Sequence, residues 1–184
     1  MGKSSWISNL SFRGLALFLR LRERSGSPRR QIEALGLSRG QVVLDYGCGV
    51  GSYTLPAARV VGPEGTVHAL DIHPLAVETV RKRSGQQNLS NVKTILSGLD
   101  TGLADESVDV ALLYDVFHYV SDRRALLREL HRVLEADGRL SVIPDHMSED
   151  ELLDTVQTGG LFSLQTRRNR SFEFGKEARG EPAR

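Results

Sequence analysis

The 184-residue sequence contains one cysteine, Cys48, and no hydrophobic run long enough to cross a membrane. A single cysteine excludes an intramolecular disulfide and a cysteine-rich metal site, and it favours a reducing, cytoplasmic setting. The longest apolar run near the N-terminus, residues 14–19, is far shorter than the roughly 20 residues that a bilayer requires. Arginines interrupt that part of the chain and no small-residue cleavage site follows, so no cleaved signal peptide is predicted.

Patterns typical of metal and nucleic-acid binding are also missing. The five histidines are scattered at spacings that match no metal-ligand set. No nucleic-acid module is appended and no aromatic-rich RNA-binding motif is present, so we expect no nucleic-acid partner. The composition, with 40% hydrophobic and 26% charged residues, is that of an ordinary globular domain with one core. Nothing in the sequence indicates an oligomeric state.

Charge is distributed unevenly, although the formal net charge is only +1. The balance is +6 over residues 1–40 (eight Lys and Arg against two Asp and Glu) and −8 over residues 41–166 (ten against eighteen). It is +3 over residues 167–184 (six against three). Basic ends can attract phosphates or anionic lipid, but a solvated surface is the simpler interpretation.

Residues 10–24 form an amphipathic segment within the basic N-terminal part. Its apolar residues recur at near-helical spacing between arginines: Leu15, Phe18, Leu19 and Leu21. We expect this segment to pack over the binding cleft as a lid or against the sheet, with peripheral membrane contact as the alternative. On this basis the chain divides into an N-terminal segment (1–27), a main domain (28–175) and a flexible tail (176–184).

From residue 41 onward, strand-like and helix-like patterns alternate. Predicted strands cover 42–44, 66–72, 92–96, 108–114 and 139–143, and predicted helices cover 52–61, 74–83 and 121–134. Gly138 is expected to mark the end of the last of these helices, and Ser148 with Glu151 forms a capping box for a further one. A short helix with Ser27 as its N-cap precedes the first strand and ends at Gly36.

Alternation of this kind predicts a parallel sheet with helices on both faces. Two more strand-like runs, 161–166 and 171–174, are separated by only four residues, so they should pair antiparallel. No helical pattern fills residues 97–107, between the third and fourth strands. The predicted fold is a Rossmann-like, doubly wound α/β domain whose mostly parallel, seven-stranded sheet has an antiparallel last strand.

The strongest functional signal is VVLDYGCGVGSYT, residues 42–54. An apolar strand leads into Asp45, then Gly47, Gly49 and Gly51, and then a helix. Open α/β sheets bind ligands at the carboxyl ends of their strands, and glycines let the backbone approach such a ligand closely. A nicotinamide-dependent dehydrogenase would show G-x-G-x-x-G, and an acid before the first glycine would repel its pyrophosphate. The pattern suits a ligand with an ammonium group and a sulfonium, such as S-adenosylmethionine.

A second signal is HALDIHP, residues 68–74. Asp71 ends the next strand, twenty residues after Gly51, where a carboxylate can accept hydrogen bonds from both ribose hydroxyls. Ile72 beside it can pack on the adenine. A helix N-cap is the competing role for Asp71.

Together these features resemble the class I S-adenosylmethionine-dependent methyltransferases, in the large group similar to the ubiquinone/menaquinone methylases, over about residues 28–175. The glycine-rich stretch resembles the D/E-x-G-x-G-x-G loop of that family, and SVDVALLYDVFHYVSD (107–122) and LHRVLEADGRL (130–140) resemble its fourth strand, next helix and entry to the fifth strand. The resemblance implies that the loop holds the methionine part of the cofactor and that Asp71 holds the ribose. The loop residues implied are Asp45, Tyr46, Gly47, Cys48, Gly49 and Gly51, with Cys48 as a small filler rather than a nucleophile.

In the resembling family, residues after the third strand line the adenine. Here SGLDTGLADESVD offers Ser97, Gly98, Leu99 and Asp100, of which we favour Leu99 and Asp100. Asp115 follows the fourth strand, where the family approaches the methionine part or the substrate.

Two histidines near the same strand ends are candidate catalytic residues. His118 lies three residues after Asp115, and His146 follows the fifth strand. Histidine titrates near neutral pH, so either side chain could act as a general base, while a packed or solvated role competes for each. The expected activity is direct in-line methyl transfer to a small or lipid-like acceptor, which depends mainly on positioning. The alternative is a methyltransferase-like protein that binds the cofactor without turnover and acts as a partner or regulator.

Overall fold

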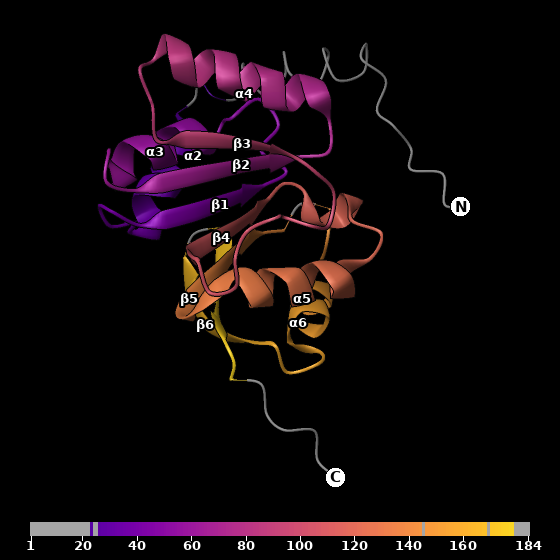
Figure 1. Cartoon of the computed structure of the whole chain (residues 1–184). Coiled ribbons are helices and arrows are strands. Elements are labelled where there is room, and N and C mark those ends of the chain that lie inside the picture. Colours follow the sequence, from indigo (N-terminus) through magenta and orange to yellow (C-terminus); the bar gives the residue numbers. More distant parts are fainter. Residues whose placement is uncertain (1–22, 24–25, 145, 169, 179–184) are drawn as a thin grey trace.

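The computed structural model describes residues 23, 26–144, 146–168 and 170–178. Helices and strands alternate through most of this range (Figure 1). In chain order they are α2 (Ser27–Leu35), β1 (Val42–Tyr46), α3 (Thr54–Val61), β2 (Thr66–Asp71), α4 (Pro74–Gln86), β3 (Val92–Leu96), β4 (Val108–Tyr114), the 3-10 helix η1 (Phe117–Tyr119), α5 (Arg123–Val133), β5 (Leu134–Ile143), α6 (Glu149–Gln157), β6 (Phe162–Arg168) and β7 (Ser171–Lys176).

The seven strands form one sheet in the order β3-β2-β1-β4-β5-β7-β6. Neighbouring pairs among β1 to β5 are parallel, whereas β7 pairs antiparallel with both β5 and β6. The predicted fold class is therefore confirmed, including the antiparallel last strand. Strand order reverses between β1 and β4, so the carboxyl ends of these two strands border the position where open α/β sheets bind ligands.

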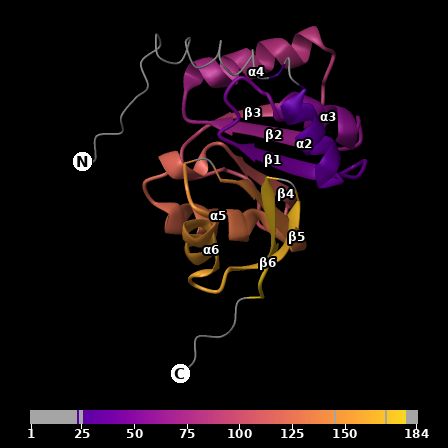
Figure 2. The ribbon, with the colours of Figure 1, turned by 180° about the vertical axis from the view of Figure 1, so that it is seen from behind.

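Helices cover both faces of the sheet (Figures 1 and 2). On one face Val43, Val67 and Val110 pack with apolar residues of α2 and α3, and on the other Leu44, Ala111 and Val142 pack with those of α5 and α6. Side chains alternate between faces along a strand, so adjacent residues of β1 belong to different clusters. Because both faces are buried, the central strands β1 and β4 consist mainly of apolar residues.

The main departure from the predicted elements lies between α5 and β5. The helix ends at Val133 and the strand starts at Leu134, so Gly138 lies inside the strand rather than at the end of the helix. The register with β4 shifts here, since Val108 pairs with Leu134 but Val110 pairs with Arg139. A Cβ on Gly138 would lie 2.9 Å from the carbonyl oxygen of Glu135, so glycine serves this bulge and not a helix terminus.

Smaller differences concern helix ends. The N-cap of α2 is Gly26 rather than Ser27, while its C-cap is Gly36 as predicted. Ser148 caps α6 by accepting a hydrogen bond from the Glu151 N–H, at 3.2 Å, which confirms that half of the predicted capping box.

The amphipathic segment 10–24 falls outside the described residues apart from Glu23, and so does most of the tail 176–184. The lid, membrane and tail assignments therefore stay predictions. Within the described part of the chain, none of the helices combines the length and the apolar character needed to cross a membrane.

Candidate functional site

A left-handed glycine turn follows β1. Gly47, Gly49 and Gly51 have φ values of +80°, +53° and +83°, a region that residues with a side chain rarely adopt. A Cβ on Gly47 would also lie 2.3 Å from Cγ2 of Val116, which follows β4. The turn is therefore glycine-rich for two reasons, backbone conformation and the close approach of the segment after β4.

Asp71 joins this turn to the end of β2. Its Oδ2 accepts a hydrogen bond from the Gly49 N–H at 2.9 Å, and its Oδ1 accepts one from the His73 N–H at 2.8 Å. A carboxylate has about four acceptor sites, so beside the backbone N–H groups of Gly49, His73 and Ile72 the group can still accept a ligand hydroxyl. Burial raises the pKa of Asp71, while the backbone N–H donors act in the opposite direction. The N-cap of α4 is His73, whose Nδ1 accepts from the Leu75 N–H, so the cap role considered for Asp71 belongs to His73.

Asp45 lies beneath the turn and is only 2% exposed. Its Oδ2 accepts a hydrogen bond from the Thr54 hydroxyl at 2.5 Å, at the start of α3. Burial raises the pKa of this carboxyl to about 6, and the nearby carboxylates of Asp71 and Asp115 act in the same direction. The structure thus gathers three acidic side chains around the glycine turn.

The other two loop residues named from the sequence, Tyr46 and Cys48, are buried. Burial raises the pKa of Tyr46 to about 12, and burial together with the charge of Asp45 raises that of the Cys48 thiol well above its usual range. A thiol that resists ionisation is a poor nucleophile, in agreement with the predicted filler role.

The carboxyl end of β4 contributes Asp115, which has a left-handed φ of +58°. Its Oδ2 accepts a hydrogen bond from the Tyr53 hydroxyl at 3.0 Å. The Tyr53 ring also packs edge-on against Tyr114, with ring centroids 4.8 Å apart. A non-glycine residue in this conformation must be held there by its surroundings, a situation that is common at functional sites.

Two residues of this site, Tyr53 and Thr54, were missed by the sequence reasoning. Both carry hydroxyls in the first turn after the last glycine, and each bonds to one of the predicted acids. The available signal was the run Ser-Tyr-Thr directly after Gly51, where a helix begins next to the strand ends.

The two candidate histidines lie next to each other although they follow different strands. The ring centroids of His118 and His146 are 5.1 Å apart, and that of Tyr119 is 3.8 Å from His118. Tyr119 is 68% exposed, and His146 has a left-handed φ of +58°. An aromatic cluster with two imidazoles therefore follows the carboxyl ends of β4 and β5, and Asp115 lies three residues before His118.

Exposed apolar side chains lie beyond Asp71. Ile72 is 57% exposed, Leu96 is 57% exposed and Leu99 is 39% exposed. Gly98 lies against Ile72, because a Cβ built on it would be 3.9 Å from the Ile72 Cδ1 atom. Two of the residues predicted to contact the adenine, Ile72 and Leu99, are thus exposed apolar side chains, as contact with a flat aromatic base requires.

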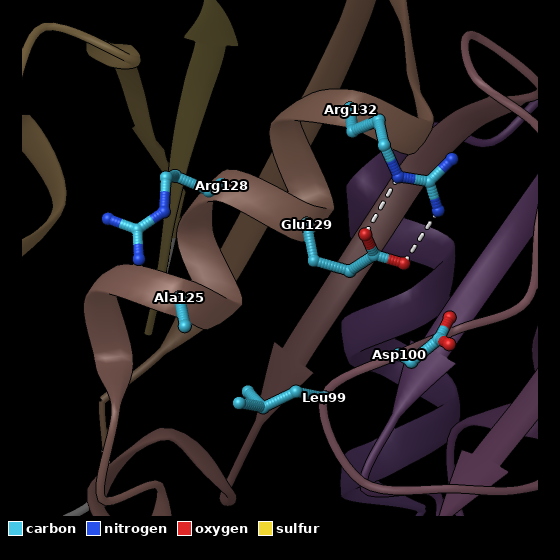
Figure 3. Close-up of a pocket in the computed structure, with 6 residues that line it drawn as sticks. All are labelled: Leu99, Asp100, Ala125, Arg128, Glu129 and Arg132. Carbon is cyan, nitrogen blue, oxygen red and sulfur yellow. Dashed lines mark hydrogen bonds and ion pairs between the residues drawn. The ribbon is translucent and has the colours of Figure 1, made fainter.

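No helix connects β3 and β4, as predicted, and residues on α5 hold the connecting loop instead. The N–H and hydroxyl of Thr101 donate to Oε1 of Glu129, at 3.0 and 2.6 Å. Arg132 is joined to Glu129 by two hydrogen bonds (Figure 3). It also donates to the carbonyl oxygen of Leu103 at 2.9 Å. The Arg132 guanidinium lowers the pKa of Glu129 to about 2. This ion pair fixes the loop that carries Leu99 and Asp100.

A groove of about 360 Å³ lies on the outer side of that loop. The residues that line it come from the loop and from α5 (Figure 3): Leu99, Asp100, Ala125, Arg128, Glu129 and Arg132. The Oδ1 atom of Asp100 accepts a hydrogen bond from the Gly102 N–H at 2.9 Å, within the same loop.

The residues present fit S-adenosylmethionine. Three carboxylates around a glycine turn suit the ammonium and sulfonium charges and the ribose hydroxyls, and exposed Ile72 and Leu99 suit the adenine. A dinucleotide pyrophosphate would meet repulsion from the same acids. Among the described residues no group of three or more His, Cys, Asp or Glu side chains is arranged to hold a metal ion.

Comparison with known proteins gives the same assignment. The family described as Methyltransferase domain matches residues 37–169. Aklanonic acid methyltransferase DauC from a Streptomyces species is 32% identical over 115 residues, which cover 61% of this chain and 52% of that protein. The ubiquinone/menaquinone biosynthesis C-methyltransferase UbiE from a Marinomonas species is 31% identical over 138 residues, which cover 74% of this chain and 55% of that protein. The chain thus spans about half the length of the curated relatives it matches.

Among solved structures, an S-adenosylmethionine-dependent methyltransferase from Aquifex aeolicus has the same fold, with a TM-score of 0.70 at 23% identity. The alignment covers 81% of this chain and 88% of that one. The family match, the glycine turn and the placement of Asp71 lead to one conclusion. The chain belongs to the family described as Methyltransferase domain, with the fold of the class I S-adenosylmethionine-dependent methyltransferases, and S-adenosylmethionine is its cofactor.

Proposed function

We propose that this chain transfers the methyl group of S-adenosylmethionine to a small-molecule or lipid-like acceptor that binds beside His118 and His146. The observation that carries this proposal is the adjacency of the two imidazoles, 5.1 Å apart, after the carboxyl ends of β4 and β5. The named relatives support a small acceptor, since one acts on aklanonic acid and another in ubiquinone/menaquinone biosynthesis.

In this proposal the cofactor extends along the carboxyl ends of β1, β2 and β3. Asp45 and Asp115, with the glycine turn, hold the methionine part. Asp71 accepts a hydrogen bond from the ribose with the acceptor capacity that the backbone N–H groups of Gly49, His73 and Ile72 leave available. Ile72 and Leu99 enclose the adenine, and Asp100 lies at its edge.

The reaction is a direct displacement. A bond forms between the acceptor atom and the methyl carbon while the bond from carbon to sulfur breaks, and the electron pair stays on sulfur to give S-adenosylhomocysteine. If the acceptor atom carries a proton, His118 or His146 accepts it. Alignment of the two reactants supplies most of the acceleration, since the sulfonium is already activated.

The exposed Tyr119 ring is the part of the cluster that an acceptor would meet first, because 68% of it is exposed. A planar acceptor can stack on this ring with its ionisable group toward the imidazoles. The cluster is therefore best matched to an acceptor with an acidic hydroxyl or carbon on a flat ring system.

Two measurements test the proposal. Calorimetric titration with S-adenosylmethionine, S-adenosylhomocysteine and NADH should show binding of the first two and none of NADH. Transfer of a labelled methyl group should then be followed with a panel of phenols, quinols, carboxylic acids and amines. We expect label on a phenol or quinol, and label on amines alone would contradict the proposed acceptor chemistry. Cofactor binding with no transfer to any acceptor would favour a non-catalytic partner or regulator.

A further inference from the structure

Glu23, which precedes α2, makes an ion pair with Arg83 at the far end of α4. The Nη1 atom of Arg83 donates to Oε1 of Glu23 at 2.9 Å, and its Nη2 atom donates to Oε2 at 2.7 Å. This two-bond geometry is the strongest arrangement between a guanidinium and a carboxylate. The side chains are only 19% exposed for Arg83 and 22% exposed for Glu23, so solvent screens the pair less than a surface pair.

The same ion pair is bonded to the glycine turn on both sides of Gly51. The Ser52 hydroxyl donates to Oε1 of Glu23 at 2.7 Å, and Nη1 of Arg83 donates to the carbonyl oxygen of Val50 at 2.6 Å. From the other side, Asp71 accepts from the Gly49 N–H. The turn is thus held between Asp71 on one side and, on the other, the ion pair of Glu23 and Arg83, here called the clamp.

We propose that Glu23 is a positioning residue for cofactor binding. Through Ser52 and Arg83 it holds the glycine turn in the shape that receives the methionine part, and it links the segment before α2 to the turn. This inference rests on the cofactor site proposed above. It assigns no contact between Glu23 and the cofactor, so the effect of Glu23 on binding is transmitted through the turn.

The clamp differs from a merely stabilising ion pair in what its loss should change. A stabilising pair raises the free energy of unfolding and leaves cofactor affinity alone. A clamp on the turn changes affinity as well, because the free protein then samples turn conformations that do not bind. The exposed pair of Arg29 and Glu33 on α2, with side chains 77% and 49% exposed, provides a matched control for loss of an ion pair.

The experiment compares S-adenosylhomocysteine binding by calorimetry across the wild type, Glu23→Gln, Ser52→Ala, Ser52→Thr and Glu33→Gln, at a temperature where each is folded. We expect affinity to fall roughly 10-fold in Glu23→Gln and several-fold in Ser52→Ala, the usual range for lost hydrogen bonds to a charged group. Ser52→Thr keeps the hydroxyl and should bind like the wild type, as should Glu33→Gln. The double variant Glu23→Gln/Ser52→Ala should lose less than the product of the single losses, because the two side chains share one bond.

Amide hydrogen exchange of residues 47–54 in the ligand-free proteins gives a second readout. Exchange should be faster in Glu23→Gln and Ser52→Ala than in the wild type, and unchanged in Glu33→Gln. Wild-type affinity and exchange in Glu23→Gln, the variant that affects the bonds to both Ser52 and Arg83, would overturn the clamp while leaving the cofactor site intact. Failure of the wild type itself to bind S-adenosylhomocysteine would overturn the cofactor site and the clamp together.

Discussion

The backbone N–H of Gly49 donates a hydrogen bond to Oδ2 of Asp71 across 2.9 Å. This bond joins the glycine turn after β1 to the end of the neighbouring strand β2. One carboxylate therefore has two tasks, to hold the turn and to accept ligand hydroxyls. The two residues are 22 positions apart in the sequence, and the parallel pairing of β1 with β2 brings them together.

Replacing Asp71 should weaken cofactor binding strongly. Asp71→Ala removes the acceptor for Gly49 and for the ribose, and should cost about 1–3 kcal/mol of binding free energy, the usual cost of stranding hydrogen-bond partners. Asp71→Asn should weaken binding nearly as much, because the NH2 group of the asparagine side chain would face a backbone N–H of Gly49 or His73, and two donors cannot bond to each other. Calorimetry with S-adenosylhomocysteine measures both, with the exposed Glu78→Ala as the control. Unchanged affinity in Asp71→Ala would rule out the ribose assignment.

Gly47→Ala should destabilise the fold and impair binding. The new Cβ would meet Val116 at 2.3 Å and also force alanine into a φ of +80°. Gly40→Ala is the matched control, since Gly40 has a φ of +86° with nothing within 4 Å of the added Cβ. Both variants should lose about 1–2 kcal/mol to the backbone conformation, and Gly47→Ala roughly 1–3 kcal/mol more to the clash. If urea denaturation gave the same loss of unfolding free energy for Gly47→Ala and Gly40→Ala, the segment after β4 would move away from the new Cβ at no energetic cost.

Asp45→Asn should stabilise the protein while weakening cofactor binding. Burial raises the pKa of Asp45 to about 6, so the folded protein holds this proton more tightly than the unfolded chain. The protonated Asp45 carboxyl therefore makes its full contribution to the free energy of unfolding below about pH 4, and this contribution is lost as the pH rises through about 6. At about pH 7.5 the variant should gain up to roughly 2–3 kcal/mol, a gain that shrinks toward about pH 4.

Thermal unfolding at several pH values measures that gain, and S-adenosylhomocysteine titration measures the accompanying loss of affinity. A variant with lower stability than the wild type at neutral pH would contradict the buried, charged state of Asp45. Thr54→Val, which removes the hydroxyl bonded to this carboxylate, should further raise the pKa of Asp45.

Glu129→Gln should loosen the connection between β3 and β4. Arg132 lowers the pKa of Glu129 to about 2. The Glu129 carboxylate therefore contributes to the free energy of unfolding above the pKa of the unfolded chain, near 4.3, and this contribution is lost as the pH falls toward about 2. The variant should lose roughly 1–2 kcal/mol at neutral pH and show a shallower loss of stability in acid. Denaturation at several pH values tests this, with the exposed Glu33→Gln as a control that should keep the wild-type slope.

His118→Ala should abolish most turnover without changing cofactor affinity, if the acceptor loses a proton during transfer. Removal of a general base lowers kcat about 10²–10⁴-fold. Imidazole added to the assay should restore part of the lost rate, which a packing role for His118 would not allow. The same pair of measurements on His146→Ala decides which ring accepts the proton, and His68→Gln, on β2, serves as the control.

The order of strands and helices could be predicted because it depends on local patterns. The central strands β1 and β4 are mainly apolar, and β3 and β4 occur at the residues that the sequence predicted. The boundary between α5 and β5 was wrong, because Gly138 looks the same in sequence whether it ends a helix or allows a bulge. Only the pairing of β5 with β4 shows that the chain there must be extended.

The chemistry of the cofactor site was readable from the sequence, since glycines in a left-handed turn and an acid at the next strand end are requirements of single positions. The contacts that hold the site could not be predicted from the sequence, because they join residues far apart in the chain: Tyr53 with Asp115, Glu129 with Thr101, and Glu23 with Arg83. A hydrogen bond requires its two atoms within about 3 Å, and no short-range pattern records which distant segments come that close. The sequence by itself determined the fold class and the cofactor, and the packing of helices on the sheet decided which side chains position the turn and which two histidines meet.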